Sequence, residues 1–330
     1  MDQEVFDWIN AKLNLDMAAE DFELSKLTPE DWETVVSRCS HGYDWCDLLK
    51  LKPEFADRCP WDKLNGNDWR YLLSCRPEFS NRCPWDKLNG EDWRRLLMSR
   101  PGFADLCSWE KLDGWDWSKL LSEQPQFADK CPWDKLAGWG WLLREQPQFA
   151  DRCPWDKLSG NVWSSLLQYR PEFANKCNWE KLSGEDWSRL LSKQPQFADR
   201  CDWKQLDGWN WSCILRNQPQ FADRCLWKKL DGWNWSCILR DQPQFADRCP
   251  WEELDGRAWC WLLIDQPQFA GRCPWDKLCG DGWSYLLRFQ PQFADRCDWE
   301  KLRDLDSELW DELLAAQPQF ADKRPQAQTE

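Results

Sequence analysis

The sequence predicts an all-α fold, an α-solenoid of about twelve helix-turn-helix repeats with a cap at each end. A Pro followed two residues later by Phe recurs with a usual period of 24 residues. In most periods a Trp precedes a Leu-Leu or Ile-Leu pair by three residues, which is a helical spacing, and the alternation typical of strands is absent. The repeating prolines are Pro53, Pro77, Pro101, Pro125, Pro147, Pro171, Pro195, Pro219, Pro243, Pro267, Pro291 and Pro318.

The first helix of each repeat is expected to begin at this Pro, which we number as repeat position 1. Pro suits the first turn of a helix, because its missing N–H would have no partner there. It also disfavours helical geometry in the residue before it, so the preceding helix must end there. The segment PQFADRC and its counterparts, such as Pro219–Cys225, are therefore predicted to be short helices.

The second helix is expected to begin at repeat positions 13 and 14. Asp, Asn or Ser precedes Gly there, as in Asn65-Gly66 and Asp207-Gly208, and such residues cap helix starts. The helix then runs for about ten residues to the next Pro. Helices this short are marginal alone in water, so they must stack on their neighbours. Gln at position 24, as in Gln242, is expected to hydrogen-bond backbone groups at the helix junction.

The irregular repeats predict the domain organisation. Residues 1–50 are a degenerate N-terminal cap, 51–300 the tandem repeats, 301–323 a C-terminal capping repeat and 324–330 a polar tail. The repeat from Pro125 is two residues short, and alignment on Trp139, Leu142 and Leu143 places the deletion in the loop.

Charge limits the possible partners. The net charge is −14, and nucleic-acid binding draws on clustered Lys and Arg, so a nucleic-acid partner is not expected. A basic or neutral protein partner fits better. The first residues are acidic, as at Glu4 and Asp7, and no apolar run reaches the length of a membrane span. We therefore expect no signal peptide, no membrane contact and a cytoplasmic protein.

Recurrent apolar positions predict the core. Phe127, Cys131, Trp133, Leu136 and their counterparts, at repeat positions 3, 7, 9 and 12, are expected to be buried. An alternative for the position-9 Trp series is an aromatic ladder that binds sugars or peptides.

The cysteines and the one His offer little chemistry. Eleven of the 18 Cys occupy repeat position 7, and stacked equivalent positions lie too far apart for disulfides, so packing is the expected role. Cys39, His41 and Cys46 form the one local cluster that suggests a metal or a thiolate-imidazole pair, without an obvious fourth ligand. No phosphate loop occurs and His41 alone is available for a triad. We expect no enzyme activity, no metal and no cofactor.

The variable face of the second helix is the predicted binding surface. Positions 15 and 19 lie one turn apart, and in neighbouring repeats they hold aromatic and Cys residues flanked by Arg, a composition typical of interfaces. The alternative is that each position-15 Trp packs on its neighbour and closes the patch. The candidate partner-binding residues are Trp209, Cys213, Arg216, Trp233, Cys237, Arg240 and Trp261.

The string QPQFADRCPWDKLDGWxWSxLL resembles the short tryptophan-rich repeats that form helical arrays in uncharacterised bacterial proteins. In architecture the chain is similar to tetratricopeptide and Sel1-like α-solenoids, with a shorter unit. Neither resemblance implies an activity or a cofactor. The function expected is a non-catalytic scaffold for protein-protein interaction. The alternatives are a self-assembling, fibre-forming repeat protein and, less in keeping with the residues, an enzyme or metal-binding protein.

Overall fold

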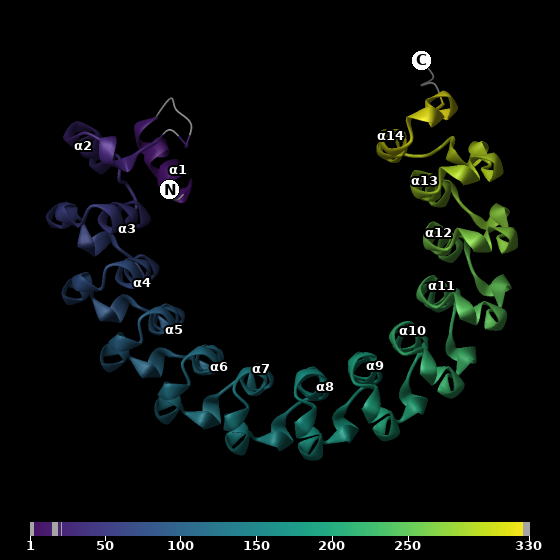
Figure 1. Cartoon of the computed structure of the whole chain (residues 1–330), viewed down its shortest axis with the longest axis horizontal. Coiled ribbons are helices and arrows are strands. Elements are labelled where there is room, and N and C mark those ends of the chain that lie inside the picture. The colour runs from purple at the N-terminus through teal and green to yellow at the C-terminus, as the bar shows by residue number, and fades with distance from the viewer. Residues whose placement is uncertain (1–2, 15–18, 21, 326–330) are drawn as a thin grey trace. The chain divides into compact units, whose positions relative to one another are not determined.

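The computed structural model describes residues 3–14, 19–20 and 22–325, and within these ranges every regular element is helical. The predicted all-α solenoid is confirmed, since successive helices stack in a regular array. The chain forms two compact units, Met1–Cys153 (unit 1) and Pro154–Glu330 (unit 2). In each unit the α-helices from residue 42 onward form one row, and the 3-10 helices lie beside it (Figure 1). Residues 326–330 of the predicted tail lie outside the described residues.

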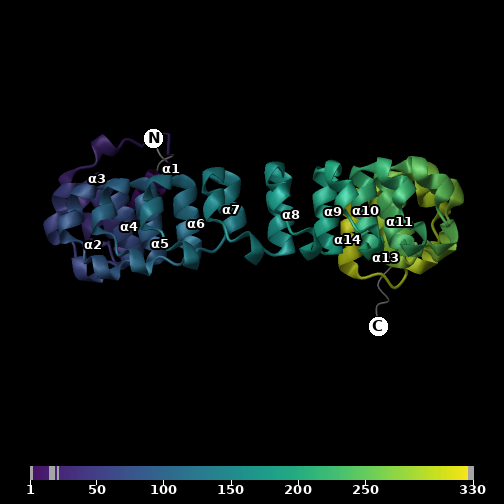
Figure 2. The same cartoon turned by 90° about the horizontal axis from the view of Figure 1, so that it is seen from below.

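The α-helices stand side by side within each unit (Figure 2). Those of unit 1 are α1 (Gln3–Leu13), α2 (Pro29–Ser37), α3 (Gly42–Leu51), α4 (Gly66–Cys75), α5 (Gly90–Ser99), α6 (Gly114–Glu123) and α7 (Trp139–Glu145). Those of unit 2 are α8 (Gly160–Tyr169), α9 (Gly184–Lys193), α10 (Gly208–Asn217), α11 (Gly232–Asp241), α12 (Gly256–Asp265), α13 (Gly280–Phe289) and α14 (Ser307–Ala316).

The segment that begins at each repeat Pro is a six-residue 3-10 helix, from η2 (Pro53–Arg58) to η24 (Pro318–Lys323). The position of the short helix is predicted correctly, but its type is not. The hydrogen bonds of this helix join residues three apart, as from the Cys225 N–H to the Ala222 oxygen at 3.2 Å. The backbone of Cys225 is extended, so the helix ends after six residues. Such a short helix gains little from α-helical hydrogen bonds. A second 3-10 helix, such as η17 (Trp227–Lys229), follows and was not predicted.

Side-chain caps fix most starts of the α-helices, as predicted. In α10 the Asp207 carboxylate accepts the backbone N–H of Asn210 at 2.8 Å, and the Asn210 side chain accepts that of Asp207 at 3.2 Å. This reciprocal pair satisfies two of the donors that a helix start leaves without partners. In α13 the capping position holds Cys279, whose side chain makes no capping bond.

Replacing Cys279 with Asp is expected to stabilise unit 2 by about 0.5–2 kcal/mol, because the carboxylate gains a backbone donor of α13. Asp255 shows this geometry in α12, where it accepts the N–H of Ala258 at 2.7 Å. Urea unfolding of the two proteins measures the gain. Cys279→Ala is the control, and an equal gain in that variant would mean that loss of the thiol, not capping, is responsible.

The fully buried aromatic residue of each regular repeat is the Trp at position 17. Trp235 of α11, for example, is stacked on Trp227 with ring centroids 5.1 Å apart, and Trp227 also meets Phe245 of the next repeat at 5.4 Å. The position-9 Trp therefore joins two repeats. The guanidinium of Arg248 also lies over the Trp227 ring, 5.2 Å from its centroid.

The predicted burial is correct for Phe127, Cys131 and Leu136 and wrong for Trp133, and several counterparts of the Phe and the Cys in other repeats are only half-buried. Trp133 is half-buried because it covers Trp139 from outside, at 5.7 Å, and lies on the surface of the 3-10 row. The other position-9 Trp residues are likewise half-buried. The indole that seals the core is the one at position 17.

Two polar ladders connect successive repeats. Gln242 donates from Nε2 to the backbone oxygen of Arg216 at 2.7 Å, which confirms the role predicted for position 24. Lys229, at position 11, donates from Nζ to the backbone oxygens of Lys204 at 2.7 Å and Leu206 at 2.5 Å. Equivalent lysine bonds occur in several repeats, so the Lys of the DKL string ties one repeat to the next.

The short repeat corrects one prediction. Its deletion is not confined to the loop, because α7 has 7 residues where α6 has 10. Gly138 stands before α7 with φ of 70°, a conformation that suits glycine, and the first helical turn is missing. The phase of the helix is kept as predicted, since Trp139, Leu142 and Leu143 are buried.

Candidate functional site

An aromatic stripe crosses one face of α10 to α13 in unit 2. It consists of Trp209 on α10, Trp233 on α11, Trp261 on α12, and Tyr285 and Phe289 on α13. These four helices are consecutive neighbours in the row (Figures 1 and 2). The stripe arises because positions 15, 19 and 23 lie on the side of the helix opposite the buried Trp and Leu residues.

Ring contacts run without a break from α11 to α13. Trp233 and Trp261 meet edge to face with centroids 6.0 Å apart, and Trp261 and Tyr285 lie 5.4 Å apart. Tyr285 then meets Phe289 at 5.1 Å. Trp209 makes no ring contact among the described residues and is 49% exposed, and Phe289 is 52% exposed. The stripe is thus an ordered aromatic surface with open rings at both ends.

Both alternatives for the position-15 Trp residues occur. Trp233 packs on the neighbouring helix, where Trp261 and the guanidinium of Arg257, 5.2 Å from its ring centroid, cover it in part. Trp209 remains open. The geometry brings the predicted aromatic residues to one face, and whether that face binds a partner stays a prediction.

The two predicted cysteines occupy position 19 of the same face and are less exposed than Trp209. Cys237 is buried and Cys213 half-buried, and burial raises the pKa of both thiols. The predicted arginines form ion pairs across the helices: Arg216 with Asp241, and Arg240 with Asp265 at 3.3 Å. The four charged side chains neutralise one another in pairs and border the stripe.

A pocket of 510 Å³ opens between α12 and α13 at the end of the stripe. Trp261 and Tyr285 form its aromatic wall, and Arg257 and Arg288 supply cations at its edge. Tyr285, Phe289, Arg257 and Arg288 were not among the predicted site residues. Arg257 and Tyr285 occupy positions 15 and 19, so the rule used for Trp209 and Trp261 would have found them, whereas Arg288 and Phe289 occupy positions 22 and 23 of the same face.

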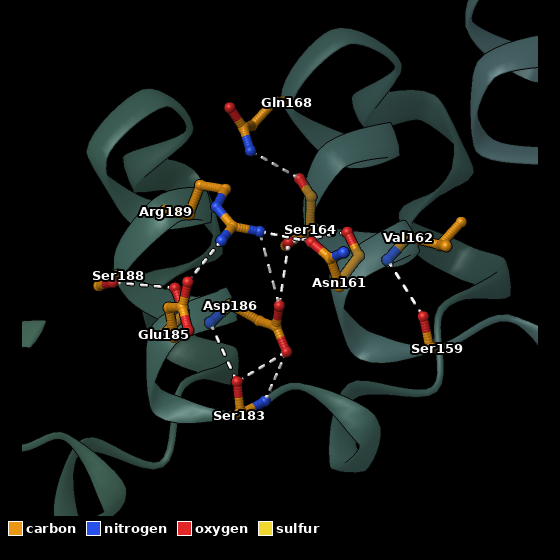
Figure 3. Close-up of polar contacts among 10 residues, drawn as sticks. All are labelled: Ser159, Asn161, Val162, Ser164, Gln168, Ser183, Glu185, Asp186, Ser188 and Arg189. Atoms are coloured by element: carbon orange, nitrogen blue, oxygen red, sulfur yellow. Dashed lines mark hydrogen bonds and ion pairs between the residues drawn. The ribbon is translucent and has the colours of Figure 1, made fainter.

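Polar contacts link the neighbouring helices α8 and α9 (Figure 3). Arg189 donates to the Asn161 side chain at 2.5 Å and pairs with Glu185 at 2.7 Å. Asp186 accepts from Ser164 at 3.4 Å while it caps α9 through Ser183. Positions 15 and 19 of α8 and α9 are thus polar, although Tyr169 at position 23 of α8 is exposed, and within unit 2 the run of contacting rings extends from α11 to α13.

Unit 1 carries two further exposed indoles that the prediction omitted. Trp115 on α6 is 57% exposed and Trp141 on α7 is 46% exposed. The guanidinium of Arg144 lies 4.5 Å from the Trp141 ring centroid. Both follow the same rule of positions 15 and 19.

The cysteines and His41 show no reactive arrangement in the described part of the chain. All 18 thiols are free, and burial raises the pKa of Cys225 to about 12. Cys39 donates to the Val35 carbonyl at 3.2 Å, His41 contacts the Ser40 hydroxyl at 2.8 Å, and Cys46 is buried. Among the described residues, no three His, Cys, Asp or Glu side chains come together as metal ligands.

The fold and this face define an α-solenoid repeat protein built from tryptophan- and proline-marked units of about 24 residues. Comparison of the chain with known proteins finds no matching family, no matching curated protein and no matching solved structure. Within the described residues, no helix combines the length and apolarity needed to span a bilayer.

Proposed function

We propose that the chain is a non-catalytic scaffold that binds a protein partner through the aromatic stripe. The observation that carries the proposal is the unbroken contact from Trp233 to Phe289, with the open ring of Trp209 beside it. Contiguous exposed aromatic surface is costly in water and marks interaction sites, and Trp, Tyr and Arg dominate binding energy at interfaces.

The rigidity of the stripe supports the same role. Trp261 and Tyr285 contact rings on both sides, so little side-chain freedom remains to be lost when a partner binds. The ion pairs of Arg216 and Arg240 hold the border in place. A partner with a neutral or basic surface suits a chain whose net charge is −14.

The test is a double variant, Trp209→Ser with Trp233→Ser. We expect the amount of partner captured from extracts of the native organism to fall about tenfold or more, since two interface aromatics are removed. Circular dichroism should show unchanged helicity. Trp115→Ser, which removes an exposed indole from unit 1, is the matched control and should leave capture intact.

Two outcomes would contradict the proposal. Unchanged capture by the double variant would show that the stripe is not the interface. If instead the purified wild-type protein forms filaments that the double variant loses, the stripe binds a second copy of the chain, and the scaffold function gives way to self-assembly.

A further inference from the structure

A second cavity, unconnected with the aromatic stripe, lies in unit 1 among α1, α3 and α4. Its volume is 270 Å³. Trp8 of α1, Tyr43 of α3 and Tyr71 of α4 supply three aromatic side chains to its lining. Tyr43 is largely exposed, whereas Trp8 and Tyr71 are half-buried, so the cavity is walled by aromatic groups and open on one side.

A carboxylate lies at the wall of this cavity. Asp47 accepts a hydrogen bond from the Tyr71 hydroxyl at 3.1 Å, and burial raises the pKa of Asp47. Burial therefore deprives the charged carboxylate of solvation by water. A cation beside it would stabilise its negative charge.

The lining is acidic on balance. Glu4, Asp47 and Asp68 supply carboxylates, and Lys50 and Arg70 supply cations. The Arg70 guanidinium donates to the Asn67 side chain at 2.8 Å. The sum of these formal charges is −1, which disfavours an anionic ligand.

Lys50 shows how an ammonium group sits here. Its Nζ donates to the Tyr71 hydroxyl at 3.3 Å and lies 5.8 Å from the centroid of the Tyr71 ring. Aromatic faces attract organic cations, and they do so most strongly when several rings surround the charge. The Tyr71 hydroxyl thus already accepts an ammonium group at the edge of the cavity.

We propose that this cavity binds an organic ammonium group, held by the aromatic side chains of Trp8, Tyr43 and Tyr71 that line it and by the charge of Asp47. The group is either a small free quaternary ammonium ion or the end of a lysine side chain, methylated or not. A cavity of 270 Å³ has room for such a group.

The experiment uses the full chain and two probes of the same shape, choline and its neutral analogue 3,3-dimethylbutan-1-ol, in isothermal titration. We expect choline to bind about tenfold or more tightly than the alcohol, because only choline carries the charge that the rings and Asp47 attract. Equal affinities of the two probes would overturn the proposal.

Variants locate the site. Asp47→Asn should weaken choline binding about tenfold, whereas Lys50→Gln should tighten it by removing the resident cation. Tyr71→Phe keeps the ring and should retain most of the affinity. Controls in the same unit are Asp57→Asn, an exposed carboxylate paired with Arg82, and Trp141→Leu. Loss of binding in these controls, or none in Asp47→Asn with its fold intact by circular dichroism, would refute the site.

A peptide with a central N-trimethyllysine between Gly and Ser residues distinguishes the two sources. Tighter binding of the peptide than of choline assigns the site to a lysine side chain of a partner. Tighter binding of choline assigns it to a free ammonium ion.

Discussion

Replacing Trp211 with Ala is expected to lower the free energy of unfolding of unit 2 by about 3–5 kcal/mol. Trp211 lies at position 17 of α10, is fully buried and is stacked on Trp203 with centroids 5.2 Å apart. Removal of the indole leaves a cavity between the α-helical and 3-10 rows that packed neighbours cannot fill without moving. Urea unfolding followed by circular dichroism measures the loss.

Trp209→Ala is the matched control, because Trp209 stands two residues away on the same helix and is exposed. It is expected to change stability by no more than about 0.5 kcal/mol. Hydrogen exchange should show the damage from Trp211→Ala concentrated in α9 to α11, since repeats contact only their neighbours. Similar losses in the two variants would show that the indole at position 17 is not the one that seals the core.

Replacing Gly232 with Ala is expected to destabilise unit 2 by about 1–3 kcal/mol. A Cβ at Gly232 would stand 2.3 Å from the backbone oxygen of Glu253 and 2.9 Å from the Cα of Leu254. These are backbone atoms of the next repeat, so they cannot rotate away, and the repeats must separate. Glycine at position 14 is therefore needed because two repeats approach closely at the helix start.

Gly271→Ala is the control for this substitution, because no atom lies within 4 Å of the Cβ position at Gly271. It should be neutral or slightly stabilising, since Ala restricts the unfolded chain more than Gly does. Thermal unfolding of both variants measures the difference. If Gly232→Ala were as mild as Gly271→Ala, close packing between repeats would not be what requires glycine at position 14.

Most features that sequence reasoning predicted are fixed within one repeat, and the bond from Gln242 to the preceding repeat is the exception. The cap at Asp207 and Asn210 depends on residues three apart, and the burial of Ile214 and Leu215 follows from their helical spacing after Trp211. Gln242 was placed correctly because its position next to Pro leaves few partners besides backbone. The 3-10 geometry of the Pro segments was missed, since the same residues suit the first turn of either helix type.

The site was harder to predict because exposure depends on the neighbouring repeat. Residues 201–224 and 225–248 differ at three positions only, yet Trp209 is open and Trp233 is half-buried. At position 19 the repeat after Trp233 presents Trp261, whereas the repeat after Trp209 presents the small Cys237. The sequence of a single repeat therefore does not determine whether its position-15 Trp is exposed. That exposure depends on which repeat is stacked next to it.

The stacked indoles also change how the protein interacts with light. Pairs such as Trp203 with Trp211 and Trp227 with Trp235 are nearly parallel and hold the same geometry from repeat to repeat. Two identical chromophores in fixed contact share their electronic excitation, so each pair absorbs as a coupled dimer and contributes its own rotational strength in the far ultraviolet. Helical content read from the amide bands alone will therefore be biased.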